Sequence, residues 1–154
     1  MSDSVTFEEV LANNGRLAYT NVGISMLPLI REGKDVLLIE AVSDRGVHRW
    51  DAVLFRRPGV TGRGAYVLHR VLKILPDGRY WIVGDNCISG EMVESQDVLG
   101  ILTQVQRDNG KIIRVTDLKY RLYVLFWCRP YYIRFFVLRV IGVLRRIKRK
   151  IHGI

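Results

Sequence analysis

Three short segments of this 154-residue chain carry side chains suited to nucleophilic hydrolysis. Ser25 lies in the segment 23–28 (GISMLP), His69 lies in an apolar stretch, and the segment 84–86 (GDN) adds a carboxylate. A serine hydroxyl is a weak nucleophile that needs a base within hydrogen-bond reach and donors for the developing oxyanion. A neutral imidazole can accept the serine proton near neutral pH and later protonate a leaving amine. We therefore expect Ser25 to be the nucleophile and His69 its base.

The residues around Ser25 suit a sharp bend that exposes one hydroxyl. Gly23 allows the backbone to approach a substrate closely, and Pro28 fixes the chain just after the turn. The backbone N–H of Ser25 is then one expected donor to the oxyanion. We also expect Gly23 and Met26, on either side of the serine, to contribute to oxyanion or substrate binding.

His69 is expected in the middle of a strand, where side chains alternate between the two faces. It then shares a face with Val67 and Val71 and points towards an apolar layer beside the serine turn. The alternative is a histidine at the edge of the core with no part in the chemistry. Lys73 lies roughly 13 Å further along the strand, too far to serve the same point, and is expected to be solvated or at an edge.

A carboxylate that orients the imidazole of His69 would complete a catalytic triad. Asp85 is one candidate, although an aspartate at a strand end can instead tie a turn through its own side chain. Asn86 is expected to tie that turn. Glu91 and Glu94 compete with Asp85 for the role of orienting His69.

The elements that must position these groups are short apolar stretches separated by turns. Residues 6–11 predict a short helix capped by Thr6 and ended by Asn13-Asn14-Gly15. Short strands with regular turn signals favour a small, mainly β, antiparallel fold over residues 1–117. The predicted strands cover residues 17–22, 35–42, 50–55, 65–75, 79–83, 98–107 and 111–115.

Charge divides the chain into two parts. Residues 1–117 contain 14 Lys and Arg and 15 Asp and Glu, a formal charge of −1, whereas residues 118–154 contain 10 Lys and Arg and no acid. Uniform positive charge would indicate a nucleic-acid partner. A segregated basic segment mixed with aromatic residues instead favours an anionic membrane surface, so we expect no nucleic-acid partner.

Residues 118–154 are predicted to form two amphipathic helices separated at Pro130. No stretch approaches the roughly 18–20 uncharged residues of a bilayer span, so helices that lie on the membrane surface fit best. One alternative is that Phe135, Leu138 and Ile141 pack on the β domain. Another is a tilted span with snorkelling arginines.

Neither a metal nor a cofactor is expected, because Cys87 and Cys128 fit no common zinc spacing and are too few for a disulfide framework. Residues 1–14 contain acids and lack the apolar core of a secretory signal. Since basic segments tend to stay cytoplasmic, we expect peripheral association with the cytoplasmic face of a membrane.

These segments resemble those of the type I signal peptidases and their LexA-like self-cleaving relatives, and they follow one another in the same order as in that family. The segment 23–28 resembles the Ser-Met-x-Pro nucleophile box, and residues 66–75 (YVLHRVLKIL) resemble the strand that carries the general base. Residues 81–86 (WIVGDN) resemble the Gly-Asp-Asn box. The strand that precedes the base in the family resembles residues 51–55 (DAVLF). The strand that follows the Gly-Asp-Asn box resembles residues 98–100 (VLG).

The resemblance implies a signal-peptidase-like β fold and a membrane-associated serine endopeptidase that cleaves a peptide or preprotein. His69 occupies the position of the lysine base of most bacterial members. The endoplasmic-reticulum, archaeal and sporulation-type members use serine and histidine with an aspartate. The position of that completing acid corresponds here to Glu91, and Asp85 is the alternative.

Two other functions stay open. One is a catalytically silent peptide-binding module anchored by its basic segment. The other is a LexA-like regulator that cleaves itself. Such a regulator would carry a DNA-binding helix-turn-helix domain, and only about 20 residues precede Ser25, which is too few for one.

Overall fold

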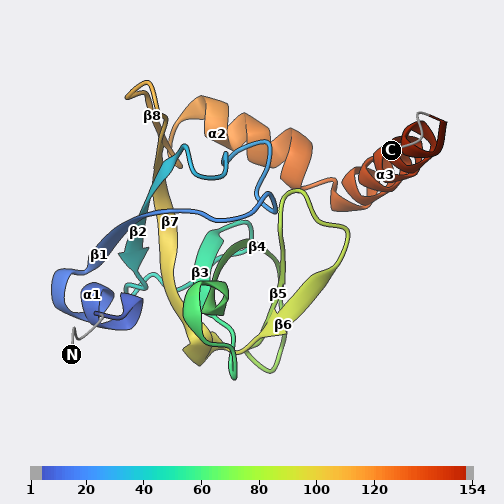
Figure 1. Cartoon of the computed structure of the whole chain (residues 1–154). Helices are drawn as coiled ribbons and strands as arrows, with labels where there is room; N and C mark the ends of the chain where they lie inside the picture. Colours follow the sequence, from blue (N-terminus) through green and yellow to red (C-terminus); the bar gives the residue numbers. More distant parts are fainter. Residues whose placement is uncertain (1–4, 152–154) are drawn as a thin grey trace.

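A computed structural model describes residues 5–151 and shows an eight-stranded antiparallel sheet with helices at both ends of the chain (Figure 1). About a third of the chain is helix and a third is strand, so the fold is mixed α/β. The antiparallel sheet predicted for residues 1–117 and the helices predicted after residue 118 are both present, but with this share of helix the whole chain is mixed and not mainly β. The strands are β1 (Arg16–Thr20), β2 (Val36–Ala41), β3 (Ala52–Arg56), β4 (Tyr66–Ile74), β5 (Tyr80–Val83), β6 (Gly90–Val93), β7 (Val98–Gln106) and β8 (Ile112–Arg114). The helices are α1 (Phe7–Asn14), the 3₁₀ turns η1 (Gly62–Ala65) and η2 (Ser95–Asp97), α2 (Leu118–Tyr123), the π-helical turn η3 (Val124–Cys128) and α3 (Tyr131–Ile151).

The strand order is β1-β2-β7-β3-β4-β5-β6, and β8 pairs with β7. The sheet has apolar clusters on both faces, which explains the unbroken apolar run of β3. Because side chains alternate along that strand, Leu54 packs in one cluster, whereas Val53 and Phe55 pack in the other. Strand β4 lies between β3 and β5 and pairs His69 with Val53. The predicted base is therefore held in the interior of the sheet and not on an edge strand.

Helix α1 confirms the helix predicted at the start of the chain and extends it to Asn14. The Thr6 hydroxyl accepts from the Glu9 N–H at 3.3 Å, and the Glu9 carboxylate accepts from the Thr6 N–H at 2.8 Å. The helix ends where Gly15 adopts the left-handed conformation with φ 69°. Phe7 then stacks on the ring of Tyr66 at the start of β4, with the ring centroids 4.5 Å apart.

Strand β6 was not predicted from the sequence. It is short and contains glycine and glutamate, which are depleted in strands, so its pattern is weak. Pairing with β5 forms it, and Glu91 lies opposite Ile82. A Cβ at Gly90 would lie 2.5 Å from the carbonyl oxygen of Ile82, so only glycine allows this close approach. The missed strand is the element that positions Glu91.

The predicted break at Pro130 is confirmed, since η3 ends at Cys128 and α3 begins at Tyr131. The two parts differ in their packing. Tyr120, Val124 and Cys128 are buried in the main core. Helix α3 is buried at Tyr131 and Arg134 and then projects away from the sheet (Figure 1).

The alternative that the later apolar residues pack on the domain holds for part of α3. Phe135 and Leu138 are half-buried, whereas Ile141 is exposed. Among residues 5–151, no helix combines the length and the apolar character needed to cross a membrane.

Candidate active site

Ser25 and His69 lie on the wall of one open cleft of about 1210 Å³. Ser25 belongs to the loop between β1 and β2, and His69 belongs to β4. Arg57, just after β3, and Cys87, between β5 and β6, line the same cleft. The structure thus brings the predicted nucleophile and base to one cavity, although no hydrogen bond joins their side chains within residues 5–151. Such contacts often tighten only when substrate binds.

The loop that carries Ser25 is fixed by a glycine turn and by the core. Gly23 has φ 93°, a conformation that favours glycine, and its N–H donates to Glu32 Oε1 at 2.6 Å. The peptide bond between Leu27 and Pro28 is cis. The side chain of Met26 is fully buried in the main core, so it cannot contact a substrate. Only the backbone N–H of Met26 is left for the oxyanion role predicted for this residue.

Two backbone donors beside the predicted nucleophile have no partner in the described part of the chain. Within residues 5–151, no hydrogen bond is donated by the N–H of Ser25 or of Met26. The next N–H along the turn, that of Leu27, donates to the Ile24 carbonyl oxygen at 3.2 Å. Adjacent unbonded N–H groups next to a nucleophile are the donors that a developing oxyanion requires.

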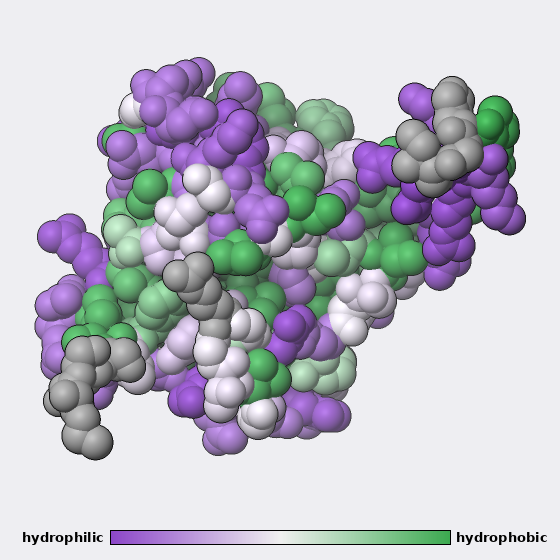
Figure 2. Space-filling view, viewed as in Figure 1, coloured by the Kyte–Doolittle hydropathy of each residue, from purple (hydrophilic) through white to green (hydrophobic). Residues whose placement is uncertain are grey.

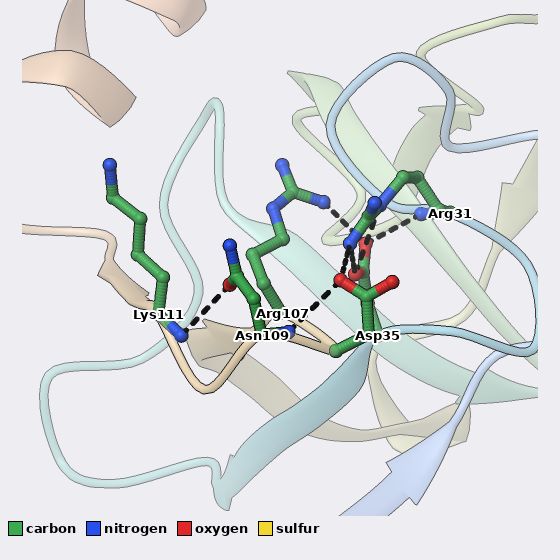
Figure 3. A network of polar contacts seen from close by, with 6 residues as sticks. Arg31, Asp35, Arg107, Asn109 and Lys111 are labelled. Atoms are coloured by element: carbon green, nitrogen blue, oxygen red, sulfur yellow. Dashed lines mark hydrogen bonds and ion pairs between the residues drawn. The ribbon is translucent and has the colours of Figure 1, made fainter.

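A polar network around Asp35 holds the end of the Ser25 loop (Figure 3). The buried Asp35 carboxylate accepts from Nε and Nη2 of Arg31 at 3.2 and 2.8 Å, and it also pairs with Arg107. Arg31 Nη2 reaches Asp108 Oδ1 at 2.7 Å. Burial alone would raise the pKa of Asp35, but the hydrogen bonds from Arg31 hold it below its ordinary value. The network therefore ties the loop to the turn between β7 and β8.

The turn between β5 and β6 packs directly on the Ser25 loop. The Asn86 N–H donates to the Ser25 carbonyl oxygen at 2.7 Å, and the Asn86 side-chain amide donates to the Ile24 carbonyl oxygen at 3.1 Å. A Cβ at Gly84 would lie 2.7 Å from the Ser25 carbonyl oxygen and 3.1 Å from Ser25 Cβ. Glycine at 84 permits the contact, and Asn86 holds it.

His69 is buried and faces Glu91. The imidazole is 8% exposed and lies against the ring of Phe55, with centroids 6.1 Å apart. Its buried Nδ1 is 3.5 Å from Glu91 Oε1. Burial lowers the pKa of His69 below its ordinary value, although the charge of Glu91 acts in the opposite direction. His69 is therefore held as a neutral imidazole at neutral pH, and its Nδ1 makes no hydrogen bond within residues 5–151.

Arg57 fixes the carboxylate that faces His69. Its Nε donates to Glu91 Oε2 at 2.9 Å and its Nη2 donates to Glu91 Oε1 at 2.7 Å, a two-pronged pair. These hydrogen bonds hold the pKa of Glu91 below its ordinary value. Glu91 is thus ionised and oriented before any substrate binds. Nothing in the sequence pattern marked Arg57 for this role.

Asp85 lies on the other side of β4, because His69 and Arg70 are neighbours in the strand and point to opposite faces. Its fully buried carboxylate accepts from Nε and Nη2 of Arg70 at 2.8 and 2.7 Å. Burial alone would raise the pKa of Asp85, but the charge and hydrogen bonds of Arg70, and then those of Tyr123, hold it below its ordinary value. The structure therefore brings Glu91, and not Asp85, to the imidazole.

The C-terminal helices complete the surroundings of Asp85. Tyr123 Oη donates to Asp85 Oδ2 at 2.8 Å, and Trp127 Nε1 donates to the Asp85 carbonyl oxygen at 3.2 Å. Arg134 Nη1 lies 3.5 Å from Asp85 Oδ1, and its three buried guanidinium nitrogens have no hydrogen bond in the described part of the chain. Sequence reasoning missed these contacts. The available signal was a hydroxyl and an indole N–H on an apolar helix, groups that need a partner when they are buried.

The remaining candidates lie outside this arrangement. Glu94 is exposed, and Lys73 is exposed with its Nζ 5.2 Å from the ring centre of Trp81. Cys87 and Cys128 are free thiols, and burial raises the pKa of both. Residues 5–151 contain no group of three or more His, Cys, Asp and Glu side chains placed to bind a metal ion.

Comparison of the chain with known protein families, with curated proteins and with solved structures gave no match.

Proposed function

We propose that the chain is a serine endopeptidase of the signal-peptidase type, with Ser25 as nucleophile, His69 as general base and Glu91 as the residue that orients the base. The observation that supports this most directly is the contact of 3.5 Å between Glu91 and His69 Nδ1, on a histidine that shares a cleft with Ser25. The resemblance of the serine, histidine and Gly-Asp-Asn segments to that family favours the same chemistry.

The reaction begins with His69 in the tautomer that carries its proton on Nδ1. The 3.5 Å ion-pair contact with the ionised Glu91 is not yet a hydrogen bond, and in the proposed reaction it must tighten into one when substrate binds, while Nε2 accepts the proton of the Ser25 hydroxyl. Ser25 Oγ attacks the scissile carbonyl carbon and forms a tetrahedral intermediate. The N–H groups of Ser25 and Met26 donate to its oxyanion.

Collapse of the intermediate breaks the C–N bond, and the imidazolium of His69 gives its proton to the leaving amine. A water molecule then attacks the acyl-enzyme, with His69 again taking the proton. The peptide is released with a new carboxylate, and the Ser25 hydroxyl is restored. Throughout, the Arg57 pair keeps Glu91 ionised, so Glu91 stabilises the transient positive charge on the imidazole.

The substrate we propose is an extended segment of a peptide or preprotein. The cleft is open and runs from the nucleophile loop past α1 to the start of β4, with Asn21 and Tyr66 on its wall. An open cleft beside the proposed nucleophile has room for an extended peptide segment.

The test is digestion of a mixture of synthetic peptides by the full chain, with products read by mass spectrometry. We expect cleavage that disappears in Ser25→Ala and in His69→Ala. Ser95→Ala is the matched control, because Ser95 is exposed in η2, and it should keep full activity. Cleavage that persists in Ser25→Ala would contradict the proposal.

A second function is favoured by the absence of a hydrogen bond between Ser25 and His69. It is a peptide-binding module that uses the same cleft without chemistry. In that case the mixture contains peptides that bind with equal affinity to the unmodified chain and to Ser25→Ala, and none is cut. The digestion and a binding measurement on the same peptides separate the two functions.

A further inference from the structure

Helix α3 leaves the domain after its first two turns. Tyr131 and Arg134 are buried against the domain, and the half-buried Phe135 and Leu138 lie on the same side of the helix. From there to Ile151 the helix extends beyond the sheet (Figure 1). The apolar residues on the side of α3 opposite to these contacts are exposed in the part of the chain that the structure describes.

That opposite side carries one continuous row of apolar residues, which we name the apolar stripe. Its members are Ile133, Phe136, Val140, Leu144, Ile147 and Ile151, with exposed fractions of 66, 68, 42, 59, 48 and 75%. At about 100° per residue they fall within an arc of roughly 80°, and they span roughly 27 Å of helix. A row of this length left in water is unusual for an isolated soluble protein.

The remainder of the projecting helix is basic. Figure 2 shows hydrophilic and hydrophobic side chains next to one another on α3. Lys148 and Lys150 lie on the two flanks of the apolar stripe, and other cations cover the side facing away from it. The exposed basic residues are Arg139, Arg145, Arg146, Lys148, Arg149 and Lys150. No Asp or Glu occurs anywhere in residues 118–154.

We infer that the apolar stripe lies on an anionic lipid surface, with α3 parallel to the membrane plane. An apolar face flanked by cations is complementary to the boundary between acyl chains and acidic headgroups. A second copy of α3 is disfavoured as the occupant, because two such helices would bring their Lys and Arg clusters together, and residues 118–154 contain no Asp or Glu. The stripe points away from the protein's own core. This inference is independent of the proposed peptidase activity.

The experiment measures co-sedimentation of the full chain with vesicles of phosphatidylcholine alone or of phosphatidylcholine with phosphatidylserine. We expect binding only to the vesicles with phosphatidylserine, and at least tenfold weaker binding when salt is raised from 0.1 to 0.5 M. Val140→Glu with Ile147→Glu should also weaken binding at least tenfold, because both changes place charge in the apolar stripe.

The matched control is Ile74→Glu with Ile112→Glu. These isoleucines are 46 and 42% exposed on β4 and β8, so the change in net charge and in exposed apolar area is similar but remote from α3. The control should bind vesicles nearly as the unmodified chain does. The inference is overturned if both double variants lose binding equally. It is also overturned if the chain does not bind the acidic vesicles, or if α3 instead forms a dimer that the stripe variant dissociates.

Discussion

At the scale of single residues, two neighbouring side chains of β4 separate two carboxylates. His69 and Arg70 point to opposite faces of the strand, so Glu91 meets the imidazole and Asp85 meets the guanidinium. Because successive side chains of β4 alternate between the two faces of the sheet, a carboxylate bound to Arg70 cannot also contact His69. The sequence interpretation applied this alternation to His69 but not to Arg70, so Asp85 stayed open as the alternative to Glu91.

The contact between Glu91 and His69 predicts a pH dependence. Only the neutral imidazole is a base, so activity falls as the pH drops through the pKa of His69. Since burial lowers that pKa, the acid limb of kcat/KM should lie below the ordinary histidine value of about 6.5. In Glu91→Gln the charge that raises the pKa of His69 is gone. The limb should therefore move to still lower pH while kcat/KM at neutral pH falls at least about tenfold.

The measurement is the pH–rate profile of each variant on one cleaved peptide. Glu94→Gln is the matched control, because Glu94 is exposed and distant from the imidazole contact, and its profile should be unchanged. A profile that moves to higher pH in Glu91→Gln would show that Glu91 does not act on His69.

At the scale of elements, the turn between β5 and β6 joins the Ser25 loop to the C-terminal helices. Asn86 bonds to the backbone at Ser25, and Asp85, one residue earlier, bonds to Tyr123 and Trp127. Neither connection requires the long strands of the sheet. The position of the nucleophile therefore depends on residues almost a hundred positions further along the chain.

The two arginines around Asp85 should differ in their effect on stability. Arg70 makes two hydrogen bonds to the buried carboxylate, so Arg70→Met removes the main partner of the Asp85 charge and should cost about 3–5 kcal/mol of the free energy of unfolding. Within residues 5–151, Arg134 makes no hydrogen bond through its buried nitrogens, so Arg134→Met should cost less than about 1.5 kcal/mol. Urea unfolding of both variants measures the difference. Equal costs would contradict this account of the cluster.

Much of the element pattern was predictable from local sequence. The capped helix α1, seven of the strands and the break at Pro130 all follow from caps, apolar runs and turn residues. Strand β6 was not predictable, because Gly90 and Glu91 have no strand preference and pairing with β5 creates it. The burial of Tyr123 and Arg134 also depends on a partner distant in sequence, so composition alone assigned their segment to a membrane.

At the scale of the whole molecule, the basic C-terminal segment has two parts. Residues up to Arg134 are packed into the domain around Asp85, and the later part of α3 projects with its apolar stripe. The change in charge at residue 118 therefore precedes the change in packing by about four turns of helix. The composition of the sequence locates the change in charge at residue 118. The end of the packed part is located only by the contacts that the helices make with Asp85.

This division predicts different results for two truncated proteins. A chain ended after Gly142 keeps the surroundings of Asp85 and should retain peptidase activity while losing vesicle binding. A chain ended after Asp117 exposes the Asp85–Arg70 pair and removes Tyr123 and Trp127, so it should lose activity as well. Peptide cleavage and vesicle co-sedimentation on both proteins give the readout. Full activity in the shorter chain would contradict the role assigned to these helices.

The groups that surround Asp85 come later in the chain than Ser25 and His69, which sets the order in which the proposed site can be completed during synthesis. Translation makes Ser25 and His69 first, and Tyr123, Trp127 and Arg134 follow more than fifty residues later. Until then, the turn that bears on the nucleophile lacks its helical support. On the proposed function, a nascent chain therefore lacks a competent site until the first turns of α3, the helix that carries the apolar stripe, have been made.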